Sequence, residues 1–362
     1  MVSVFDKYIG KIIAYHILST LLMLTSLSSM IKFVDQLRKT GQGEYNLLSA
    51  ALYTILSIPK DIEVFFPMGA LLGTLIGLGL LTQNRELIAM EAAGFTRMKI
   101  IGSVMKITLP LIVLMMLVGE FLAPIGEDMA RNYRIKKLMH TTAYSTPGSV
   151  WIRENTNFIF IERIHDNNHI TGISMYIFSQ NKRLHTVQYA KSGKYNINKK
   201  LWDLAEIYQS DLNQKYQIIN THTLHNEWKT SITPNKLRIL ALNPDTLSIR
   251  GLYSYLKYLH QSGQQGTRHQ LSMWGKIFQP LSLVVMMLMS LSLIFGPLQS
   301  TSMGVKIVTG ISFGFLFYVL NQIFGLLSLV YHASPILGAL LPSTLFFVIS
   351  ITILVIWKKQ RI

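Results

Sequence analysis

Long apolar runs, separated by short polar stretches, occupy both ends of the chain. A helix that crosses a bilayer needs about 20 predominantly apolar residues. Six runs reach this length, and they fall into two groups of three. The pattern therefore predicts six transmembrane helices, over Ile12–Val34, Val64–Thr82, Ile100–Ala123, Trp274–Phe295, Val305–Val330 and Ile336–Trp357.

The segment between the two groups of spans has a different pattern of apolar and polar residues. From Gly126 to Gln270, apolar and polar residues alternate, as in Phe158–Ile161 and Ser174–Phe178. Alternation with period two is typical of half-buried strands, and short strands at regular spacing favour a β-sandwich or a jelly roll. We therefore predict a membrane α-helical protein, with three plus three transmembrane helices and an inserted all-β jelly-roll domain. Its predicted parts are residues 1–125, 126–270 and 271–362.

A short amphipathic helix is predicted at about residues 84–94, between the second and third spans. Leu87, Ile88 and Met90 lie toward one side of it. A charged helix in this position can serve as the contact for a soluble partner, or it can be a solvated connector, and the local sequence favours neither. The residues that would carry a contact are Arg85, Glu86 and Glu91, with Gly94 ending the helix.

Composition narrows the class of protein. Half of the residues are hydrophobic and only 14% are charged, which suits a membrane protein with a soluble portion. The net charge of +16 indicates anionic partners such as lipid headgroups, phosphorylated lipids or nucleic acid. No cysteine is present, so thiol nucleophiles and disulfides are excluded. The first apolar run lacks a small-residue cleavage site, so we expect it to stay as a span.

Basic residues near the span ends predict the orientation. The loop with Arg85, Arg97 and Lys99 lies on the same side as the basic chain ends, and this side is expected to be cytoplasmic. The β domain then lies outside. A minority of cations break this rule, because Lys32, Arg38, Lys39 and Lys60 lie near the outer ends of spans one and two.

These outer cations are candidates for binding an anionic lipid headgroup. A cation inside a span costs roughly 2.5–3.5 kcal/mol on insertion scales, so it usually has a partner or a task. The alternative is that they are membrane anchors or ion-pair partners of nearby carboxylates. The candidate set is Lys32, Arg38, Lys39, Arg131 and Arg134.

Several apolar side chains are candidates for contact with acyl chains. Span two carries Phe65 and Phe66, and the aromatic span five carries Phe317 and, at membrane depth, Asn321. Plain helix packing is the competing interpretation. For the ridge of Gly69, Gly73 and Gly77 in span two, packing is the favoured interpretation, because small residues let helices approach closely.

No pattern in the chain points to catalysis. The GxxxxGK[ST] loop that cradles nucleotide phosphates is absent, as are a serine elbow and an HExxH motif. His222 and His225 have a spacing that could share a ligand, but no cysteine accompanies them. We therefore expect a non-catalytic subunit with no metal site and no cofactor of its own.

Several stretches carry a resemblance to a known family. FDKYIGKIIAYHIL, IKFVDQLRKTGQG, PKDIEVFFPMGALLG, ELIAMEAAGFTRMKI and KIFQPLSLVVMMLMSLSLIFGPL resemble the lipopolysaccharide-export permeases of Gram-negative bacteria, from one end of the chain to the other. The resemblance implies an inner-membrane transporter subunit that extracts lipopolysaccharide from the outer leaflet. It also implies a heterodimer with the permease LptF, two copies of the ATPase LptB that bind ATP and Mg²⁺, and a periplasmic bridge through LptC and LptA.

The resemblance also assigns roles to residues. The helix at 84–94 corresponds to the family's coupling helix, with Glu86 as the ionic contact to the ATPase. The five outer cations fall where the family binds lipopolysaccharide, although position 38 is arginine here where a relative has lysine, so its geometry differs. Phe65, Phe66, Phe317 and Asn321 are the expected cavity wall.

Two other classes of membrane protein are the alternatives. A mechanotransmission subunit, which moves no lipid through its own spans, would have four spans with the large domain after the first. An intramembrane enzyme would need converging catalytic groups. The predicted plan of the chain disagrees with the first, and no such groups are found for the second.

Overall fold

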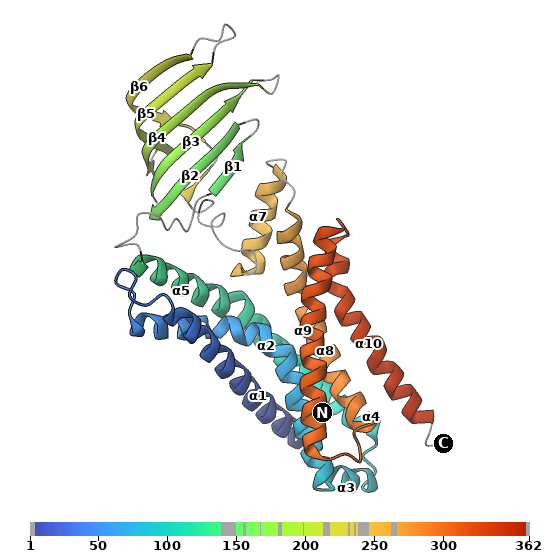
Figure 1. The fold of residues 1–362 in the computed structure, drawn as a ribbon. Coiled ribbons are helices and arrows are strands. Elements are labelled where there is room, and N and C mark those ends of the chain that lie inside the picture. The colour runs from blue at the N-terminus through green and yellow to red at the C-terminus, as the bar shows by residue number, and fades with distance from the viewer. Residues whose placement is uncertain are drawn as a thin grey trace. The chain divides into compact units, whose positions relative to one another are not determined.

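The computed structural model divides the chain into two compact units, one of residues Met1–Leu138 with Gln270–Ile362 and one of Met139–His269 (Figure 1). Each unit is described by itself. The described residues are 4–138, 150–154, 157–166, 168–179, 183–197, 199–212, 218–230, 232–234, 237, 246–261 and 266–359.

The first unit is all helical and contains every predicted span. Six helical segments are long and apolar enough to cross a membrane, which confirms the predicted helices. Each helical segment is longer than the apolar run inside it. In chain order the helices are α1 (Val4–Leu37), α2 (Leu47–Gln83), α3 (Glu86–Ala92), α4 (Arg97–Leu117), the π-helix η1 (Val118–Leu122), α5 (Ala123–Leu138), α8 (Thr267–Phe295), α9 (Met303–Val330) and α10 (Pro335–Lys359).

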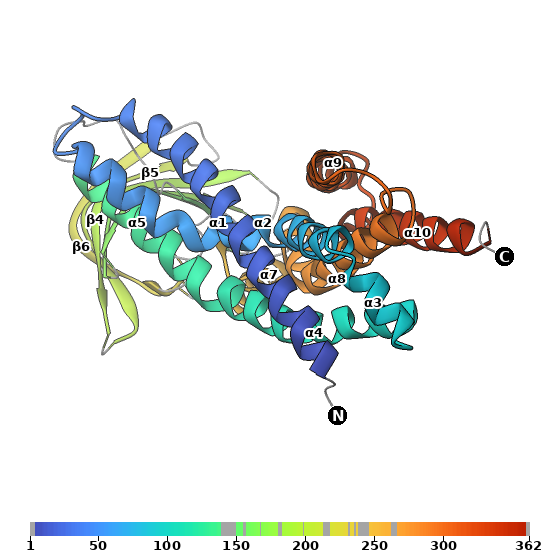
Figure 2. The same ribbon diagram turned by 90° about the horizontal axis from the view of Figure 1, so that it is seen from below.

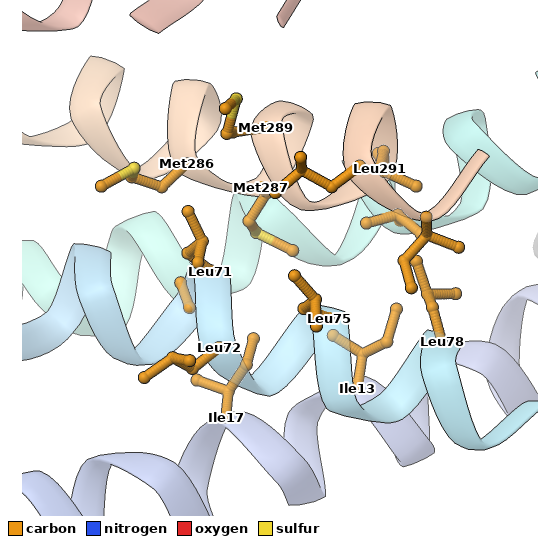
Figure 3. Close-up of a cluster of buried hydrophobic side chains, with 14 of the residues drawn as sticks. Ile13, Ile17, Leu71, Leu72, Leu75, Leu78, Met286, Met287, Met289 and Leu291 are labelled. Carbon is orange, nitrogen blue, oxygen red and sulfur yellow. The ribbon is translucent and has the colours of Figure 1, made fainter. Parts of the chain in front are cut away.

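Helix α2 lies at the centre of this unit. Of its most apolar stretch 72% is buried, against 17% for α9, so α2 is a core helix while α9 offers most of its surface to surrounding lipid or protein. Figure 3 shows leucines of α2 packed between isoleucines of α1 and methionines of α8. The labelled side chains are Ile13, Ile17, Leu71, Leu72, Leu75, Leu78, Met286, Met287, Met289 and Leu291.

The glycine ridge of α2 packs against α1, as its spacing predicts. A Cβ atom at Gly73 would overlap the backbone of Ile17, and one at Gly69 would lie 2.7 Å from a methyl group of Leu21. The two antiparallel helices approach this closely because glycine has no side chain. The ridge therefore sets the register between α1 and α2.

The third span continues without a break from α4 through η1 into α5. The extra residue of the π-turn lies at Val118–Leu122, and the polar helix after it extends to Leu138. The domain boundary predicted at residues 125 and 126 therefore falls inside a continuous helical segment. The polar composition of α5 resembles a soluble segment, but one face of the helix packs against α2.

The second unit contains one six-stranded antiparallel sheet in which every strand pairs with its neighbour in sequence. This sheet fits the predicted β domain and its jelly-roll character. Buried and exposed side chains alternate along it, as in β1, where Val150 and Ile152 are buried and Trp151 is exposed. The strands are β1 (Val150–Glu154), β2 (Asn157–Asp166), β3 (His169–Phe178), β4 (Leu184–Asn196), β5 (Leu201–Leu212) and β6 (Ile218–Trp228).

One face of the sheet holds the core of this unit. Trp202 is fully buried there and donates its indole N–H to the carbonyl of Ile232 over 2.8 Å. Helix α7 (Ile249–Gln261) adds Tyr258 to the same core. This helix corrects the prediction that residues 126–270 are all β. The sequence did contain evidence for this helix, because the spacing of the buried Leu252 and Leu259 places both on one face of a helix with about 3.6 residues per turn.

Candidate functional site

The end of α1, the start of α2 and the end of α5 gather at one end of the helical unit (Figures 1 and 2). Asn46 caps α2 by accepting a hydrogen bond from the Ser49 amide. Glu44, in the loop before it, binds α5 twice, through its own amide to the Lys137 carbonyl and through an ion pair of 2.9 Å with the Lys137 ammonium. These contacts bring the predicted cations of α1 and α5 to the same region.

Arg134 is held in place by an aromatic ring. Its guanidinium carbon lies 4.8 Å from the centre of the Tyr53 ring on α2, a cation–π contact. Tyr45 is buried beside it, and this burial raises the pKa of the Tyr45 phenol, so the group stays neutral and donates to Gln36. The ring therefore holds the Arg134 guanidinium in a fixed direction, and Arg134 forms no ion pair among the residues that the structure describes.

The other predicted cations differ in how strongly they are paired. Lys32 forms a 2.6 Å ion pair with the buried Asp61 of α2, and Lys39 forms a looser pair of 3.8 Å with Asp35. Arg38 and Arg131 form no ion pair within the described part of the chain. The site thus combines fixed, paired and unpaired positive charges, which suits an anion carrying several negative oxygens.

A charged cluster that sequence reasoning missed lies deeper in the same unit. The Glu63 carboxylate, 3% exposed, lies 2.9 Å from Lys60 and 2.9 Å from Lys276 of α8. Lys276 also donates to the carbonyl of Gly119 in η1, and Gln279 donates to the backbone carbonyl of Glu63. The cluster joins α2, the third span and α8. The sequence evidence for this cluster was the position of Glu63 and Lys276 at the edges of apolar runs, where an unpaired charge is costly.

The four residues of the predicted cavity wall have different surroundings. Phe65 is half-buried and stacks on Tyr318 of α9 at 6.5 Å, and Asn321 is exposed on α9. For Phe66 and Phe317 the structure corrects the prediction that they line a cavity. Phe66 is 1% exposed and Phe317, at 6%, packs edge-on against Phe346 at 5.2 Å, so both belong to the helix core and face no open surface of this chain.

The predicted helix between spans two and three is confirmed as α3. Leu87 and Met90 are buried against the unit, but Ile88 is 59% exposed, which corrects the prediction that all three share one side. Successive helical residues point about 100° apart, and this puts position 88 on the outer face. Arg85 (φ 61°) begins the helix, and Gly94 (φ 85°) follows its last turn with open space around it.

The charged side chains of α3 are tied to neighbouring helices. Glu86 accepts a hydrogen bond of 2.8 Å from the Tyr8 hydroxyl of α1. Glu91 pairs with Arg97 of α4 at 2.7 Å, and the Arg97 guanidinium also lies over Phe295 of α8. These contacts join α3 to α1 and α4 and, through Arg97, to α8.

The arrangement is suited to binding and mechanical coupling. Among the described residues, no group of three or more His, Cys, Asp or Glu side chains is placed to hold a metal ion. His222 instead contacts the Tyr208 ring in a tilted arrangement, with the ring centroids 4.6 Å apart.

Comparison with known proteins gives one family. Residues 7–356 match the model of the lipopolysaccharide export system permease LptF/LptG. The chain is 54% identical over 352 residues to the lipopolysaccharide export system permease protein LptG of Escherichia coli (strain K12), covering 97% of this chain and 98% of that protein. It is 45% identical over 348 residues to the protein of the same name from Haemophilus influenzae, covering 96% and 97%.

Proposed function

The chain belongs to the LptF/LptG family of lipopolysaccharide export permeases, and we propose that it extracts lipopolysaccharide from the outer leaflet of the inner membrane and passes it to a periplasmic protein bridge. Its six spans and its family make it a multi-pass permease of the export system. The observation that carries the finer proposal is the gathering of cations from α1 and α5 at one end of the helical unit, beside Arg134 on its aromatic support.

The cations recognise the phosphates of the glycolipid. Arg131 and Arg134 are three residues apart on α5 and share a face, while Arg38 and Lys39 follow the end of α1. Charge-assisted hydrogen bonds to phosphate oxygens are roughly twice as strong as neutral ones. Lys32, at the rim of the same region, adds a further ammonium group.

The cost of extraction requires an outside energy source. Removing acyl chains from a bilayer costs about 0.8 kcal/mol per methylene, so even ten methylenes cost roughly 8 kcal/mol. Phe65 and Asn321 offer part of the wall against which these chains rest. The energy comes from ATP hydrolysis in a partner subunit, LptB, which holds the nucleotide and Mg²⁺, while this chain needs no cofactor.

Helix α3 transmits that energy. Its outer face presents Arg85 and Ile88, and Glu86 and Glu91 lie at its edges. The contacts of these carboxylates with α1 and α4 support a coupling role, because movement of α3 displaces both spans. We place α3 and both termini in the cytoplasm, and the β unit in the periplasm.

The partners follow from this assignment. LptF completes the membrane cavity that one chain leaves open, which agrees with the exposed surface of α9. LptC, and through it LptA, receives the lipid from the periplasmic side. Six spans with the β unit after the third disagree with a four-span mechanotransmission subunit.

Photocrosslinking in cells tests the proposal. Photoreactive residues are placed at Lys32 and Arg134, with a control at Ile356, which is 55% exposed on α10. Lipopolysaccharide adducts at the first two positions and none at the control are expected. An assembled, exporting complex with no adduct at either cation would make these residues membrane anchors.

A further inference from the structure

We infer that Lys276 of α8 is a positioning residue: it holds the π-turn η1 in the third span, and this turn sets the rotation of α5 that presents Arg131 and Arg134. The inference rests on the proposed function, in which these two arginines meet the lipid. Lys276 does not touch the lipid itself; it acts through the backbone of η1.

The hydrogen bonds of η1 leave one carbonyl for Lys276. The Ala123 amide donates to the carbonyl of Val118, five residues back, whereas in an α-helix it would donate to Gly119, four residues back. In the π register the donor to Gly119 would be residue 124, but Pro124 has no amide hydrogen. The Gly119 carbonyl instead accepts a hydrogen bond of 3.3 Å from the Lys276 ammonium. A return to the α register would require Ala123 to take this acceptor from Lys276.

The ammonium is fixed at this carbonyl by the buried carboxylate of Glu63. The Lys276 Nζ lies 2.9 Å from Glu63 Oε1, and the two side chains are 9% and 3% exposed. Gly119 makes room for this pair, because a Cβ atom there would lie 3.1 Å from the same carboxylate oxygen. The position of the ammonium is therefore set by α2 and η1 together.

The π-turn lets both halves of the third span face the packed interior. Ile100 of α4 and Ala130 of α5 are both 0% exposed. An α-helix turns by about 100° per residue, so an unbroken α-helix would put these two residues about 120° apart. A π-turn absorbs one extra residue, and this reduces the angle to about 20°. Loss of the π-turn would therefore turn α5 by about 100° relative to α4.

The contact between α5 and α2 depends on this rotation. A Cβ atom at Gly126 would lie 2.5 Å from the backbone oxygen of Leu56, so the two helices touch through a glycine. A turned α5 would bring a side chain to this contact and would have to move away from α2. Arg134 would then leave the Tyr53 ring, whose centre lies 4.8 Å from its guanidinium carbon, and Arg131 on the same face would move with it.

Thiol labelling in the purified transporter complex measures the rotation of α5. The chain has no cysteine, so Ala130→Cys introduces a single thiol that is hidden while α5 keeps its orientation. Lys276→Met is expected to raise the rate of maleimide labelling at position 130 about tenfold, the factor that corresponds to one charge-assisted hydrogen bond. Lys191→Cys in the β unit is the control for access of the reagent, because the Lys191 side chain is 64% exposed.

Deletion of Phe121 separates positioning from general stability. Without Phe121, the Val118 carbonyl is four residues before the Ala123 amide, so the same bond becomes α-helical and α5 keeps its rotation. The deletion is expected to return labelling in Lys276→Met to the wild-type rate, and to restore assembly if Lys276→Met alone does not assemble. A purely structural role of Lys276 predicts no rescue, because the deletion replaces none of the contacts of the ammonium.

Two further variants of α8 serve as matched controls. Lys276→Arg keeps a donor and a positive charge, and it is expected to label at the wild-type rate. Gln279→Leu removes a different hydrogen bond from α8 to α2, the one to the backbone carbonyl of Glu63, and it is expected to leave labelling unchanged.

Three results would overturn the inference. These are an unchanged labelling rate in Lys276→Met, an equal increase in Gln279→Leu, and no rescue by deletion of Phe121. Failure of the proposed function is recognised separately, through lipopolysaccharide crosslinked to a photoreactive residue at Lys32. If labelling rises in Lys276→Met and is rescued while crosslinking stays at the wild-type level, α5 turns as inferred, and only the role of its arginines in lipid binding is refuted.

Discussion

The Glu63 carboxylate of α2 and the Lys276 ammonium of α8 lie 2.9 Å apart inside the helical unit, at 3% and 9% exposure. Lys60, one turn before Glu63, holds the other side of the same carboxylate. One buried anion thus serves two cations from different parts of the chain and links the first three spans to the last three.

Removing Glu63 is expected to destabilise the helical unit more than removing Lys276. Glu63→Gln leaves Lys60 and Lys276, whose side chains are 18% and 9% exposed, without their shared anion, and breaking a buried pair in this way costs about 3–5 kcal/mol. Lys276→Met leaves Glu63 still paired with Lys60, so a smaller loss is expected. Thermal unfolding of the purified complex measures both.

The exposed pair of Lys191 and Glu206 in the β unit is the control for these variants. Lys191→Met is expected to leave the melting temperature nearly unchanged, because an exposed ion pair contributes little to stability. Equal effects of Glu63→Gln and Lys276→Met would show that the shared carboxylate is not the centre of the cluster.

Gly73→Ala is expected to force α1 and α2 apart. The added methyl group would overlap the backbone of Ile17, which cannot rotate away, and overpacking of this kind costs about 1–3 kcal/mol. Gly102→Ala in α4 is the control, because its Cβ would meet no atom within 4 Å. That variant should be neutral, or more stable by up to about 1 kcal/mol because alanine favours helix. A Gly73→Ala complex with an unchanged melting temperature would contradict this packing.

Two variants test whether Glu86 contacts the ATPase. Glu86→Ala removes the carboxylate, and Tyr8→Phe removes only its 2.8 Å hydrogen bond to α1. If the carboxylate binds the ATPase, Glu86→Ala should weaken binding about tenfold, as expected for a charge-assisted hydrogen bond of roughly 1.5 kcal/mol. Tyr8→Phe should bind as the wild type does. Equal losses in the two variants would mean that Glu86 serves only to position α3. The measurement is titration of the ATPase onto the permease in detergent.

Arg134→Lys is expected to lower lipopolysaccharide crosslinking even though the charge is kept. The guanidinium stacks over the Tyr53 ring at 4.8 Å, and a contact of this kind is worth about 0.5–1 kcal/mol at an exposed site. Lysine is a flexible point charge and does not reproduce the planar stack. Crosslinking from a probe at Lys32 should fall about two- to fivefold. Tyr53→Leu should produce a similar loss. Crosslinking at the wild-type level in that variant would show that the Tyr53 ring does not support lipid binding by Arg134.

Acid should loosen the last two strands of the β unit. The ion pair with Lys199 lowers the pKa of Glu227 below its ordinary value of 4.5, and hydrogen bonds from Thr186 and Gln209 lower the pKa of Asp211. A lowered pKa contributes stability that is complete above the ordinary value and is lost as pH falls through the folded value. Amide exchange in β5 and β6 of the full chain should therefore accelerate relative to β2 and β3 below about pH 4. Glu227→Gln should reduce this difference, and an unchanged difference would contradict the role of the pair.

The sequence was a better guide to the helices and strands of this fold than to the contacts between them. The six spans were found because the length of an apolar run is a local property that lipid requires directly. The strands were found because alternation marks a sheet with one buried face. Helix α7 was missed although Leu252 and Leu259 have a helical spacing, because the alternation in the preceding residues led us to assign the whole segment to strands.

Among the candidate site residues, the cations could be selected by type and position, and their gathering depended on the structure. Phe65 and Phe66 show the limit of such reasoning. They are adjacent in sequence and equally apolar, yet one is half-buried beside Tyr318 and the other is almost fully buried. Only the positions of the neighbouring helices distinguish them.

The sequence alone is sufficient to predict the spans, the β unit, the helix between spans two and three and the excess of positive charge, because each follows from residues close together in the chain. Which of these charges are paired depends on how the helices pack. Lys32 meets Asp61, and Glu63 meets Lys276, only because α1, α2 and α8 pack at a particular register set by the glycine ridge and the apolar core. Ion pairing depends on a few ångströms between distant segments, and no local pattern encodes that distance.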